Sequence, residues 1–377
     1  MEKASYNILF LNWQDIKHPL GGGAEVYDHE ILKRIVNKGH KVTHLSCGHP
    51  TLAKDEIIDG IRTVRTGNRA LFNYYAPFTY RRLRSEEKFD IAIDAINKVP
   101  ILSPLYIRNI PVAGLVHHLF KKAIFKEAPL PVALYVNSFE RMIKYVYRKS
   151  PFIVISPSTK DDVIKSGIGE DKISIVDCSV DLDLYRTTDK PKGDAPLIGY
   201  LGRIKKYKSV DHLIKAFEIV KKTVTDSKLI IVGDGDNLDD LKELTASLKL
   251  EDSVEFTGFV SEEEKVSILQ KCHVVVNPSV KEGWGLTVIE ANACGTTTIA
   301  ADVPGLRDSV KDGETGLLYP YGDIEKCAGH IINVLKDNDF RNKLTVNAVE
   351  WSKQFSWDSA ADKMIDVIKE TIQNYKI

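Results

Sequence analysis

The chain has few cysteines, and their number does not allow all of them to pair. Its 377 residues include five, at positions 47, 178, 272, 294 and 327, and none belongs to a Cys-x-x-Cys pair. Scattered thiols in an odd number are typical neither of a disulfide framework nor of a structural zinc site. We therefore expect reduced and mostly buried cysteines.

Long hydrophobic runs are also missing. No apolar run approaches the ~18 residues that a membrane-spanning helix needs, and the first residues, MEKA, are not followed by the apolar core of a signal peptide. There is no low-complexity tract and no repeat of solenoid period. We expect a globular cytoplasmic protein, either free or held at the inner face of the membrane as a peripheral protein.

Net charge is absent as well, since 52 basic residues balance 52 acidic ones. The balance conceals a basic stretch at 117–150, where seven Lys or Arg face only Glu127 and Glu140. Its basic residues are Lys121, Lys122, Lys126, Arg141, Lys144, Arg148 and Lys149, interleaved with Phe120, Phe125, Tyr135, Phe139, Tyr145 and Tyr147. This mixture suits an anionic membrane surface, an anionic lipid-linked acceptor or RNA. An ordinary solvated helix face, with its aromatic side chains in the core, is the alternative.

Short apolar segments alternate with helical stretches through the whole chain. Strands are predicted at 8–11, 42–46, 91–94, 112–116 and 152–155, and again at 197–201, 229–232, 254–256, 274–276 and 298–300. Helices such as 24–37 and 158–165 lie between them. This alternation predicts parallel sheets covered on both faces. The polar segment 178–196 separates the two series, so we expect two Rossmann-like domains.

Two carboxylates stand eight residues apart in the segment 282–290, which reads EGWGLTVIE. Gly283 and Gly285 let the backbone approach a ligand, and 286–293 reads as a buried helix whose first amides would point at an anion. Glu282 would bind hydroxyls of a donor sugar, and Glu290 would bind ribose hydroxyls. These features suit a sugar nucleotide. The predicted donor-binding residues here are Gly283, Trp284, Gly285, Leu286, Thr287 and Glu290.

In the spacing of Glu282 and Glu290 the chain resembles glycosyltransferase family 4, the retaining sugar-nucleotide transferases of GT-B fold. The resemblance continues in 302–308 (DVPGLRD), 312–318 (DGETGLL), 199–203 (GYLGR) and 21–27 (GGAEVY preceded by a further glycine), and spans roughly residues 6–360. It implies an α/β GT-B fold, with two Rossmann-like domains facing each other across a cleft. We expect an acceptor domain at 1–185, to which the last helix, 356–377, returns, and a donor domain at 186–355.

Further residues at the ends of predicted strands are candidates for binding the nucleotide sugar. Arg203 and Lys208 follow the strand 197–201, where two cations would clamp a diphosphate and neutralise the leaving group, and the resemblance assigns them that role. Gly233 would lie near the nucleotide in a tight turn. The resemblance further implies a base pocket at Phe259 and Val260, and places His117 beside the donor sugar.

The glycines before the helix at 24–37 are candidates for a loop over the diphosphate. Gly22 and Gly23 would provide the flexibility, and the neighbouring Glu25 would either cap the helix or bind a ligand. A purely structural turn is the alternative. The predicted catalytic residues are Glu282, Arg203, Lys208 and His117.

No metal site is expected, although Asp181 and Asp183, and Asp234 and Asp236, both spell Asp-x-Asp. The cations and helix amides already provide charge for a diphosphate. We therefore predict a metal-independent retaining hexosyltransferase that uses no cofactor, takes a nucleotide diphosphate sugar as donor, and acts on a sugar or lipid-linked acceptor. No nucleic-acid partner is expected. The alternatives are an epimerase or phosphorylase of the same fold, and a non-catalytic sugar-nucleotide binding subunit.

Overall fold

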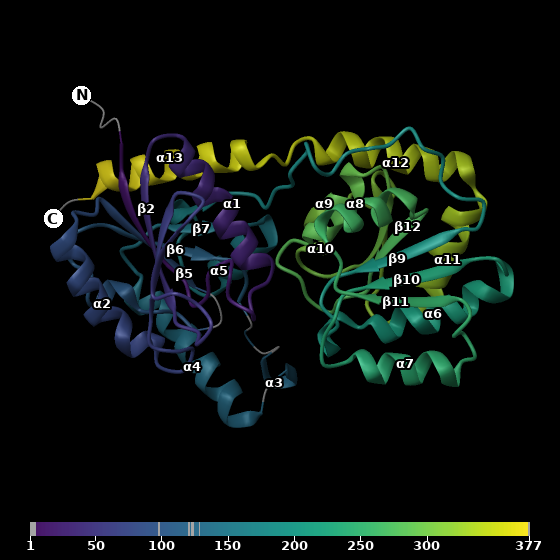
Figure 1. The fold of residues 1–377 in the computed structure, drawn as a ribbon, viewed down its shortest axis with the longest axis horizontal. Helices are drawn as coiled ribbons and strands as arrows, with labels where there is room; N and C mark the ends of the chain where they lie inside the picture. Colours follow the sequence, from purple (N-terminus) through teal and green to yellow (C-terminus); the bar gives the residue numbers. More distant parts are fainter. Residues whose placement is uncertain (1–4, 97–98, 120, 122–123, 128, 376–377) are drawn as a thin grey trace. The chain divides into compact units, whose positions relative to one another are not determined.

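The computed structural model of this chain describes residues 5–375 apart from 97–98, 120, 122–123 and 128. It divides into two compact units (Figure 1). Unit 1 comprises Met1–Cys178 and Trp357–Ile377, and unit 2 comprises Ser179–Ser356. The structure places the first boundary after Cys178, whereas the sequence pattern placed it after residue 185.

Unit 1 is built on an eight-stranded sheet of order β3-β4-β2-β1-β5-β6-β7-β8. The strands are β1 (Asn7–Leu11), β2 (Lys41–Cys47), β3 (Asp55–Ile58), β4 (Ile61–Thr66), β5 (Ile91–Ile96), β6 (Val112–Val116), β7 (Phe152–Val154) and β8 (Ile173–Ile175). All neighbours pair in parallel except β3 and β4. Strands β5 and β6 are buried along their full length, as expected for a parallel sheet covered on both faces.

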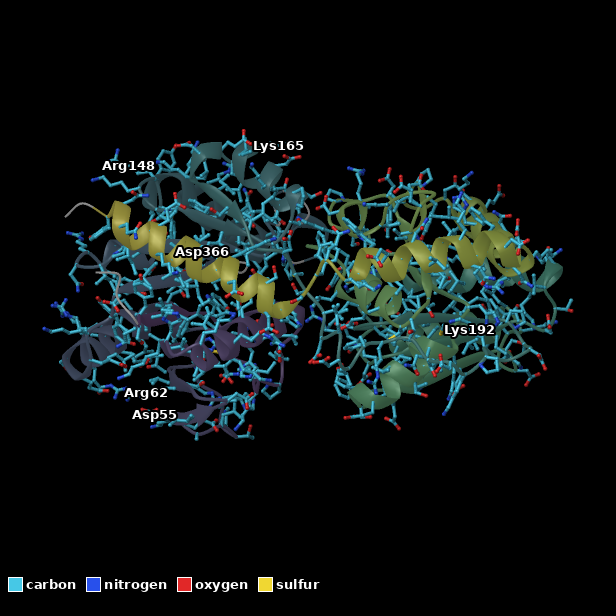
Figure 2. The ribbon with its side chains drawn as sticks, turned by 90° about the horizontal axis from the view of Figure 1, so that it is seen from above. Asp55, Arg62, Arg148, Lys165, Lys192 and Asp366 are labelled. Carbon is cyan, nitrogen blue, oxygen red and sulfur yellow. The ribbon has the colours of Figure 1, made fainter. Side chains whose placement is uncertain are left out.

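The antiparallel pair β3–β4 was not predicted from the sequence. Asp59 and Gly60 connect the two strands with φ of 48° and 80°, the left-handed conformation that two-residue hairpin turns require. Arg62 on β4 forms an ion pair with Asp55 on β3 at 2.8 Å (Figure 2). The Asp-Gly dipeptide between apolar residues was the available signal.

Among the described residues, six α-helices accompany this sheet: α1 (Gly23–Asn37), α2 (Phe72–Glu86), α3 (Ile124–Glu127), α4 (Leu130–Val146), α5 (Pro157–Lys165) and α13 (Trp357–Asn374). Helix α2 buries one face, including Phe72 and Tyr80, in a core that also contains Leu9 and Ala92. The last helix, α13, lies beside α1 (Figure 1), where Lys38 forms an ion pair with Asp362 at 2.8 Å.

Unit 2 contains a six-stranded parallel sheet of order β11-β10-β9-β12-β13-β14. Its strands are β9 (Leu197–Leu201), β10 (Lys228–Val232), β11 (Val254–Gly258), β12 (Val274–Asn277), β13 (Thr297–Ala301) and β14 (Gly316–Tyr319). Its helices are α6 (Val210–Thr223), α7 (Leu238–Ser247), α8 (Glu262–Lys271), α9 (Leu286–Ala293), α10 (Leu306–Ser309), α11 (Ile324–Lys336) and α12 (Asn338–Ser352). Both units are thus Rossmann-like, which confirms the predicted fold class. All five cysteines are buried free thiols.

Candidate functional site

Four loops of unit 2 meet at the carboxyl edge of its sheet, because they follow the neighbouring parallel strands β11, β10, β9 and β12. Backbone hydrogen bonds join the loops. Gly233 N–H donates to the Gly258 carbonyl at 2.9 Å, and Val280 N–H donates to the Tyr207 carbonyl at 3.0 Å. Open α/β sheets bind ligands at this edge. These loops carry nine of the predicted residues, namely Arg203, Lys208, Gly233, Phe259, Val260, Glu282, Gly283, Trp284 and Gly285.

Glycine is required where two of these loops touch. Gly233 has φ of 130°, and a Cβ there would lie 2.0 Å from the carbonyl oxygen of Gly202. A Cβ at Gly235 would lie equally close, 2.0 Å, to the carbonyl oxygen of Ile204. A side chain at either position would therefore force the loops apart, and with them the cations that follow β9.

Lys208 and Glu282 form an ion pair within this loop cluster. The Lys208 ammonium donates to Oε1 of Glu282, and Ser279 Oγ donates to the same oxygen at 2.7 Å. Each side chain of the pair is only 14% exposed. The pair thus holds a cation suited to a phosphate beside a carboxylate that can accept bonds from hydroxyls.

Arg203 extends into solvent from the loop after β9. Its guanidinium donates to the Tyr207 hydroxyl at 3.3 Å, and no carboxylate of the described residues pairs with it. Lys205 on the same loop is instead paired with Asp236 at 2.8 Å. Of these two cations, Arg203 therefore has the charge available for an anionic ligand.

The turn between Glu282 and α9 depends on two glycines. Gly285 has φ of 89° and immediately precedes α9, so the first amides of that helix have no side chain to cap them. Gly305 packs beneath the turn, where a Cβ would lie 2.3 Å from the Glu282 carbonyl oxygen. Uncapped amides at the start of a helix, next to Lys208, favour an anion such as a phosphate.

The side chain of Trp284 lies in the core of unit 2. Its ring packs edge to face on Phe355, with centroids 5.0 Å apart, and the indole N–H has no hydrogen-bond partner in the part of the chain that the structure describes. Burial leaves only the backbone of this residue for contact with a donor. Gly283, Leu286 and Thr287 are half-buried around it.

Glu290 lies on the second turn of α9 and pairs with a lysine that the sequence analysis did not single out. Lys265 on α8 donates to Glu290 Oε1 at 2.9 Å. The other carboxylate oxygen, Oε2, is buried and accepts no hydrogen bond from the described residues. The carboxylate therefore retains hydrogen-bonding capacity for a ligand.

Phe259 is the most exposed large hydrophobic side chain of those that the structure describes, with 93% of its surface accessible. It follows Gly258, whose φ of 70° ends β11 in a turn, and precedes the half-buried Val260. An aromatic ring held in solvent beside the loop of Gly233 offers a flat apolar face to a ligand.

In unit 1, the glycine-rich segment forms the start of α1. The Gly22 N–H donates to Glu25 Oε2 at 2.6 Å, so Glu25 caps the helix, one of the two roles considered for it. Burial raises the pKa of Glu25, and the nearby Asp28 raises it further. Gly23 begins the helix directly after this cap.

His117 follows β6 and is almost fully buried. Its Nε2 lies 3.0 Å from Asp28, which also accepts a hydrogen bond from Asn12 at 2.7 Å. Burial alone would lower the pKa of His117, but the Asp28 carboxylate outweighs burial and raises it. The other ring nitrogen, Nδ1, has no partner among the described residues. No sequence pattern indicated Asp28 as the partner of this histidine.

A buried ion pair between Arg65 and Asp15 supports the loop that leads to Gly22 and Gly23. Arg65 on β4 donates to both carboxylate oxygens of Asp15 at 2.7 Å, and Ser46 donates at 2.9 Å. Burial by itself would raise the pKa of Asp15, but these contacts lower it to about 2. No sequence pattern predicts this pair, whose members are 50 residues apart.

The Asp-x-Asp segments serve local structure. Asp181 accepts backbone hydrogen bonds from Asp183 and Leu184, Asp234 accepts one from Gly235, and Asp236 pairs with Lys205. Among the described residues, no three His, Cys, Asp or Glu side chains gather as metal ligands.

The basic stretch is divided between core and surface. Tyr147 is buried, whereas Tyr135 and Tyr145 of α4 are exposed together with Leu134 and Met142. The exposed cations near them are Arg141, Lys144, Arg148 and Lys149, of which Figure 2 labels Arg148. Phe120 and Lys122 lie outside the described residues. None of the described helices combines the length and the hydrophobicity that a membrane span requires.

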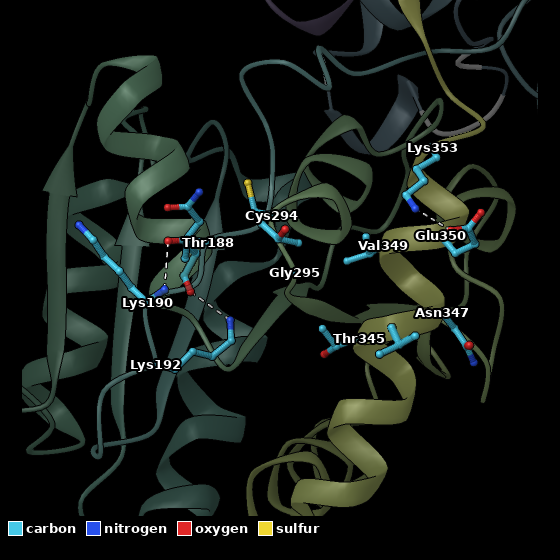
Figure 3. A pocket seen from close by; sticks show the side chains of 13 residues that line it. Thr188, Lys190, Lys192, Cys294, Gly295, Thr345, Asn347, Val349, Glu350 and Lys353 are labelled. Atoms are coloured by element: carbon cyan, nitrogen blue, oxygen red, sulfur yellow. Dashed lines mark hydrogen bonds and ion pairs between the residues drawn. The ribbon is translucent and has the colours of Figure 1, made fainter.

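A cavity of about 570 Å³ opens elsewhere in unit 2, between the segment that precedes β9, the end of α9, and α12 (Figure 3). Lys192 borders it and donates to the carbonyls of Gln270 and Cys272 and to Thr296. None of the predicted donor-site residues lines this cavity. The loop cluster at the sheet edge therefore remains the candidate site.

Two family models match the chain. The model described as Glycosyltransferase Family 4 matches residues 21–184, and the model described as Glycosyl transferases group 1 matches residues 184–351. Between them they extend over both units, and they meet in the linker after Cys178.

Relatives and solved structures agree with these matches. An uncharacterised glycosyltransferase of Methanocaldococcus jannaschii is 25% identical, over 94% of this chain and 94% of that protein. A D-inositol 3-phosphate glycosyltransferase of Mycobacteroides abscessus is 33% identical over 54% of this chain, which spans about half (48%) of that relative. The structure of HepE from Anabaena with UDP-glucose has a TM-score of 0.79 at 20% identity, covering 97% of this chain and 100% of that one, and shares the fold.

Proposed function

Because the chain belongs to the family 4 glycosyltransferases of GT-B fold, we propose that it transfers a hexose from a nucleotide diphosphate sugar to a sugar or lipid-linked acceptor, with retention at the anomeric carbon. The observation that carries the proposal is the Lys208–Glu282 pair beside the uncapped start of α9. Charge for a diphosphate and an acceptor for sugar hydroxyls meet there.

The leaving group is stabilised by protein groups in this proposal. Lys208 and Arg203 neutralise the charge that develops on the diphosphate, and the amides at the start of α9 donate to its oxygens. These groups make a metal ion unnecessary for that task, and no other cofactor is required.

Retention is what the resemblance to the retaining family 4 enzymes implies, and the lack of a well-placed carboxylate nucleophile among the matched motifs favours same-face attack over double displacement. The carboxylate of Glu282 already accepts bonds from Lys208 and Ser279, which suits sugar recognition better than covalent attack. The acceptor hydroxyl would attack the anomeric carbon from the face that the phosphate leaves, and its proton would pass to a phosphate oxygen. One C–O bond forms as the other breaks, so atoms and charge balance.

A UDP-hexose is proposed as the first donor to test, since HepE, of similar fold, was solved with UDP-glucose. Phe259, exposed beside the Gly233 loop, is proposed to contribute to the base pocket together with the Val260 backbone. His117 is proposed to act beside the sugar through its unoccupied Nδ1.

The acceptor is proposed to lie at an anionic membrane surface. The exposed face of α4 combines Tyr135 and Tyr145 with Arg141 and Lys144, a mixture that suits the headgroup region of anionic lipids. Each cation near such a surface contributes ~1 kcal/mol, so binding would be weak and reversible.

Thermal unfolding with UDP-, GDP- and ADP-hexoses tests the donor. A true donor at 100 times its dissociation constant stabilises the protein by ~2.7 kcal/mol. NMR of the product should then show the donor's anomeric configuration, and transfer should persist in excess EDTA. Loss of activity in EDTA that magnesium or manganese restores would contradict metal independence. Formation of an epimerised or phosphorolysed sugar without transfer would instead support the alternative enzymes.

A further inference from the structure

Four polar side chains form a connected series next to the proposed nucleotide site. Tyr185, which precedes β9, donates from its hydroxyl to Glu262 on α8. Lys265, one turn along α8, lies 3.6 Å from Glu262 and 2.9 Å from Glu290 on α9. Its ammonium also lies 5.2 Å from the centroid of the Tyr185 ring. Lys265 is thus the centre of the series.

Three members of the series are largely removed from water, whereas the side chain of Glu262 is 59% exposed. The side chain of Lys265 is 19% exposed and that of Glu290 is 12% exposed, while Tyr185 is buried. Burial alone would lower the pKa of Lys265, but Glu290 and Glu262 raise it. The lysine therefore remains a cation beside the Glu290 carboxylate.

One carboxylate oxygen of Glu290 accepts no hydrogen bond from the described part of the protein. Oε1 accepts from Lys265, whereas Oε2 is buried without a partner among the described residues. A buried acceptor that no donor reaches is unfavourable. A vicinal diol, such as that of a ribose, has two adjacent hydroxyl donors that can satisfy a carboxylate.

We propose that Lys265 is a positioning residue for ribose recognition, which holds the Glu290 carboxylate in the orientation that accepts the diol. Tyr185 and Glu262 in turn hold Lys265. The inference rests on the proposed function, because it requires a nucleotide at this site. It goes further by assigning nucleotide affinity to side chains of α8 and of the segment before β9.

A purely structural ion pair between α8 and α9 would give a different result in binding experiments. Loss of such an ion pair would lower the stability of the protein, and it would change the affinity for a ribonucleotide and for its dideoxy analogue to the same extent. Loss of a positioning residue removes the part of the affinity that depends on the ribose hydroxyls. The comparison of a nucleotide with its dideoxy analogue separates the two roles.

The test measures dissociation constants by calorimetry for UDP, GDP and ADP, each beside its 2′,3′-dideoxy analogue. Lys265→Met should weaken binding of the accepted ribonucleotide by ~10-fold or more and leave its dideoxy analogue unchanged. Lys265→Arg, which keeps the charge, should retain most of the preference. Lys271→Met, at the exposed end of the same helix, is the matched control and should bind as wild type.

Tyr185→Phe provides a milder variant, because it removes only the hydroxyl that donates to Glu262. It should reduce the ribose preference partially while the protein remains folded. If Lys265→Met and Tyr185→Phe both keep the full wild-type preference, or lose affinity for both analogues equally, the inference is overturned. A wild-type protein that binds none of the three nucleotides would overturn the proposed function itself, and the inference with it.

Discussion

Lys208 and Glu282 lie 74 residues apart in the chain, yet their side chains are in contact. The contact arises because β9 and β12 are neighbours in the sheet, so the loops that follow them meet. Two poorly exposed charges stabilise each other there, and removal of either would leave the other without its partner. The pair is thus both a structural link and the proposed centre of donor binding.

We predict that Lys208→Met, Glu282→Gln and Arg203→Ala each lower turnover by at least ~100-fold, the usual cost of one preorganised charge contact. Lys205→Met is the matched control, since Lys205 follows the same strand but is paired with Asp236, and it should leave turnover nearly unchanged. Initial rates with the donor found by thermal unfolding measure the effect. Near-normal rates in the folded Lys208 and Glu282 variants would refute the assignment.

The stability of unit 1 should depend on pH through His44. Burial lowers the pKa of His44 to about 4, below its ordinary value of 6.5. The unfolded state therefore binds more protons between these values, so the free energy of unfolding falls as pH falls from 6.5 to 4, by up to ~3 kcal/mol. His44→Leu should flatten this dependence in urea unfolding. An equally steep dependence in the variant would contradict the prediction.

Helix α4 has two distinct faces. Its inner face buries Ala133, Val136 and Ile143 in the unit 1 core, and its outer face exposes aromatic and basic side chains. Within this outer face Lys144 lies over the ring of Tyr145 at 4.9 Å. A helix that served only to cover the sheet would not need exposed aromatic residues, so the outer face is the proposed membrane surface.

We predict that changing Arg141, Lys144 and Arg148 to glutamate abolishes sedimentation with anionic vesicles at low salt. Neutral vesicles should bind neither protein, and added salt should release the wild type. A matched control reverses three exposed lysines of unit 2, namely Lys222, Lys242 and Lys343. If the control triple loses binding as fully as the triple of Arg141, Lys144 and Arg148, general charge rather than this face is responsible.

At the scale of the whole molecule, the last helix belongs to the first unit. Helix α13 buries Trp357, Met364, Ile365 and Ile368, and its Trp357 packs edge to face on Tyr27 of α1. Each such side chain contributes about 1.5–3 kcal/mol when it is buried. Unit 1 therefore depends on residues that follow the whole of unit 2 in the sequence.

We predict that a chain ending at Ser356 has a destabilised unit 1 and an intact unit 2. Limited proteolysis should cleave unit 1 of this chain well before unit 2. A chain ending at Asn374, which keeps α13, should resist cleavage as the full chain does. Equal protection of unit 1 in both truncated chains would show that α13 does not support it.

Much of the fold could be predicted because local patterns decide it. Alternating apolar segments of strand length, with helices between them, identified five strands of each unit and hence two parallel sheets. The hairpin of β3 and β4 and the short strands β8 and β14 were missed. Of these, β3, β8 and β14 are edge strands of only three or four residues. The Glu282 to Glu290 segment was recognisable because its glycines, helix and two acids are contiguous.

The sequence by itself thus determined the class of each unit and the chemistry of its strand ends, since both depend on residues close together in the chain. The tertiary structure decided which distant groups meet. It joined Lys265 to Glu290, Asp28 to His117 and Arg65 to Asp15, and it placed Trp284 in the core. No spacing rule connects such residues, because strand order rather than chain order sets their distances, and burial then determines which charges must pair.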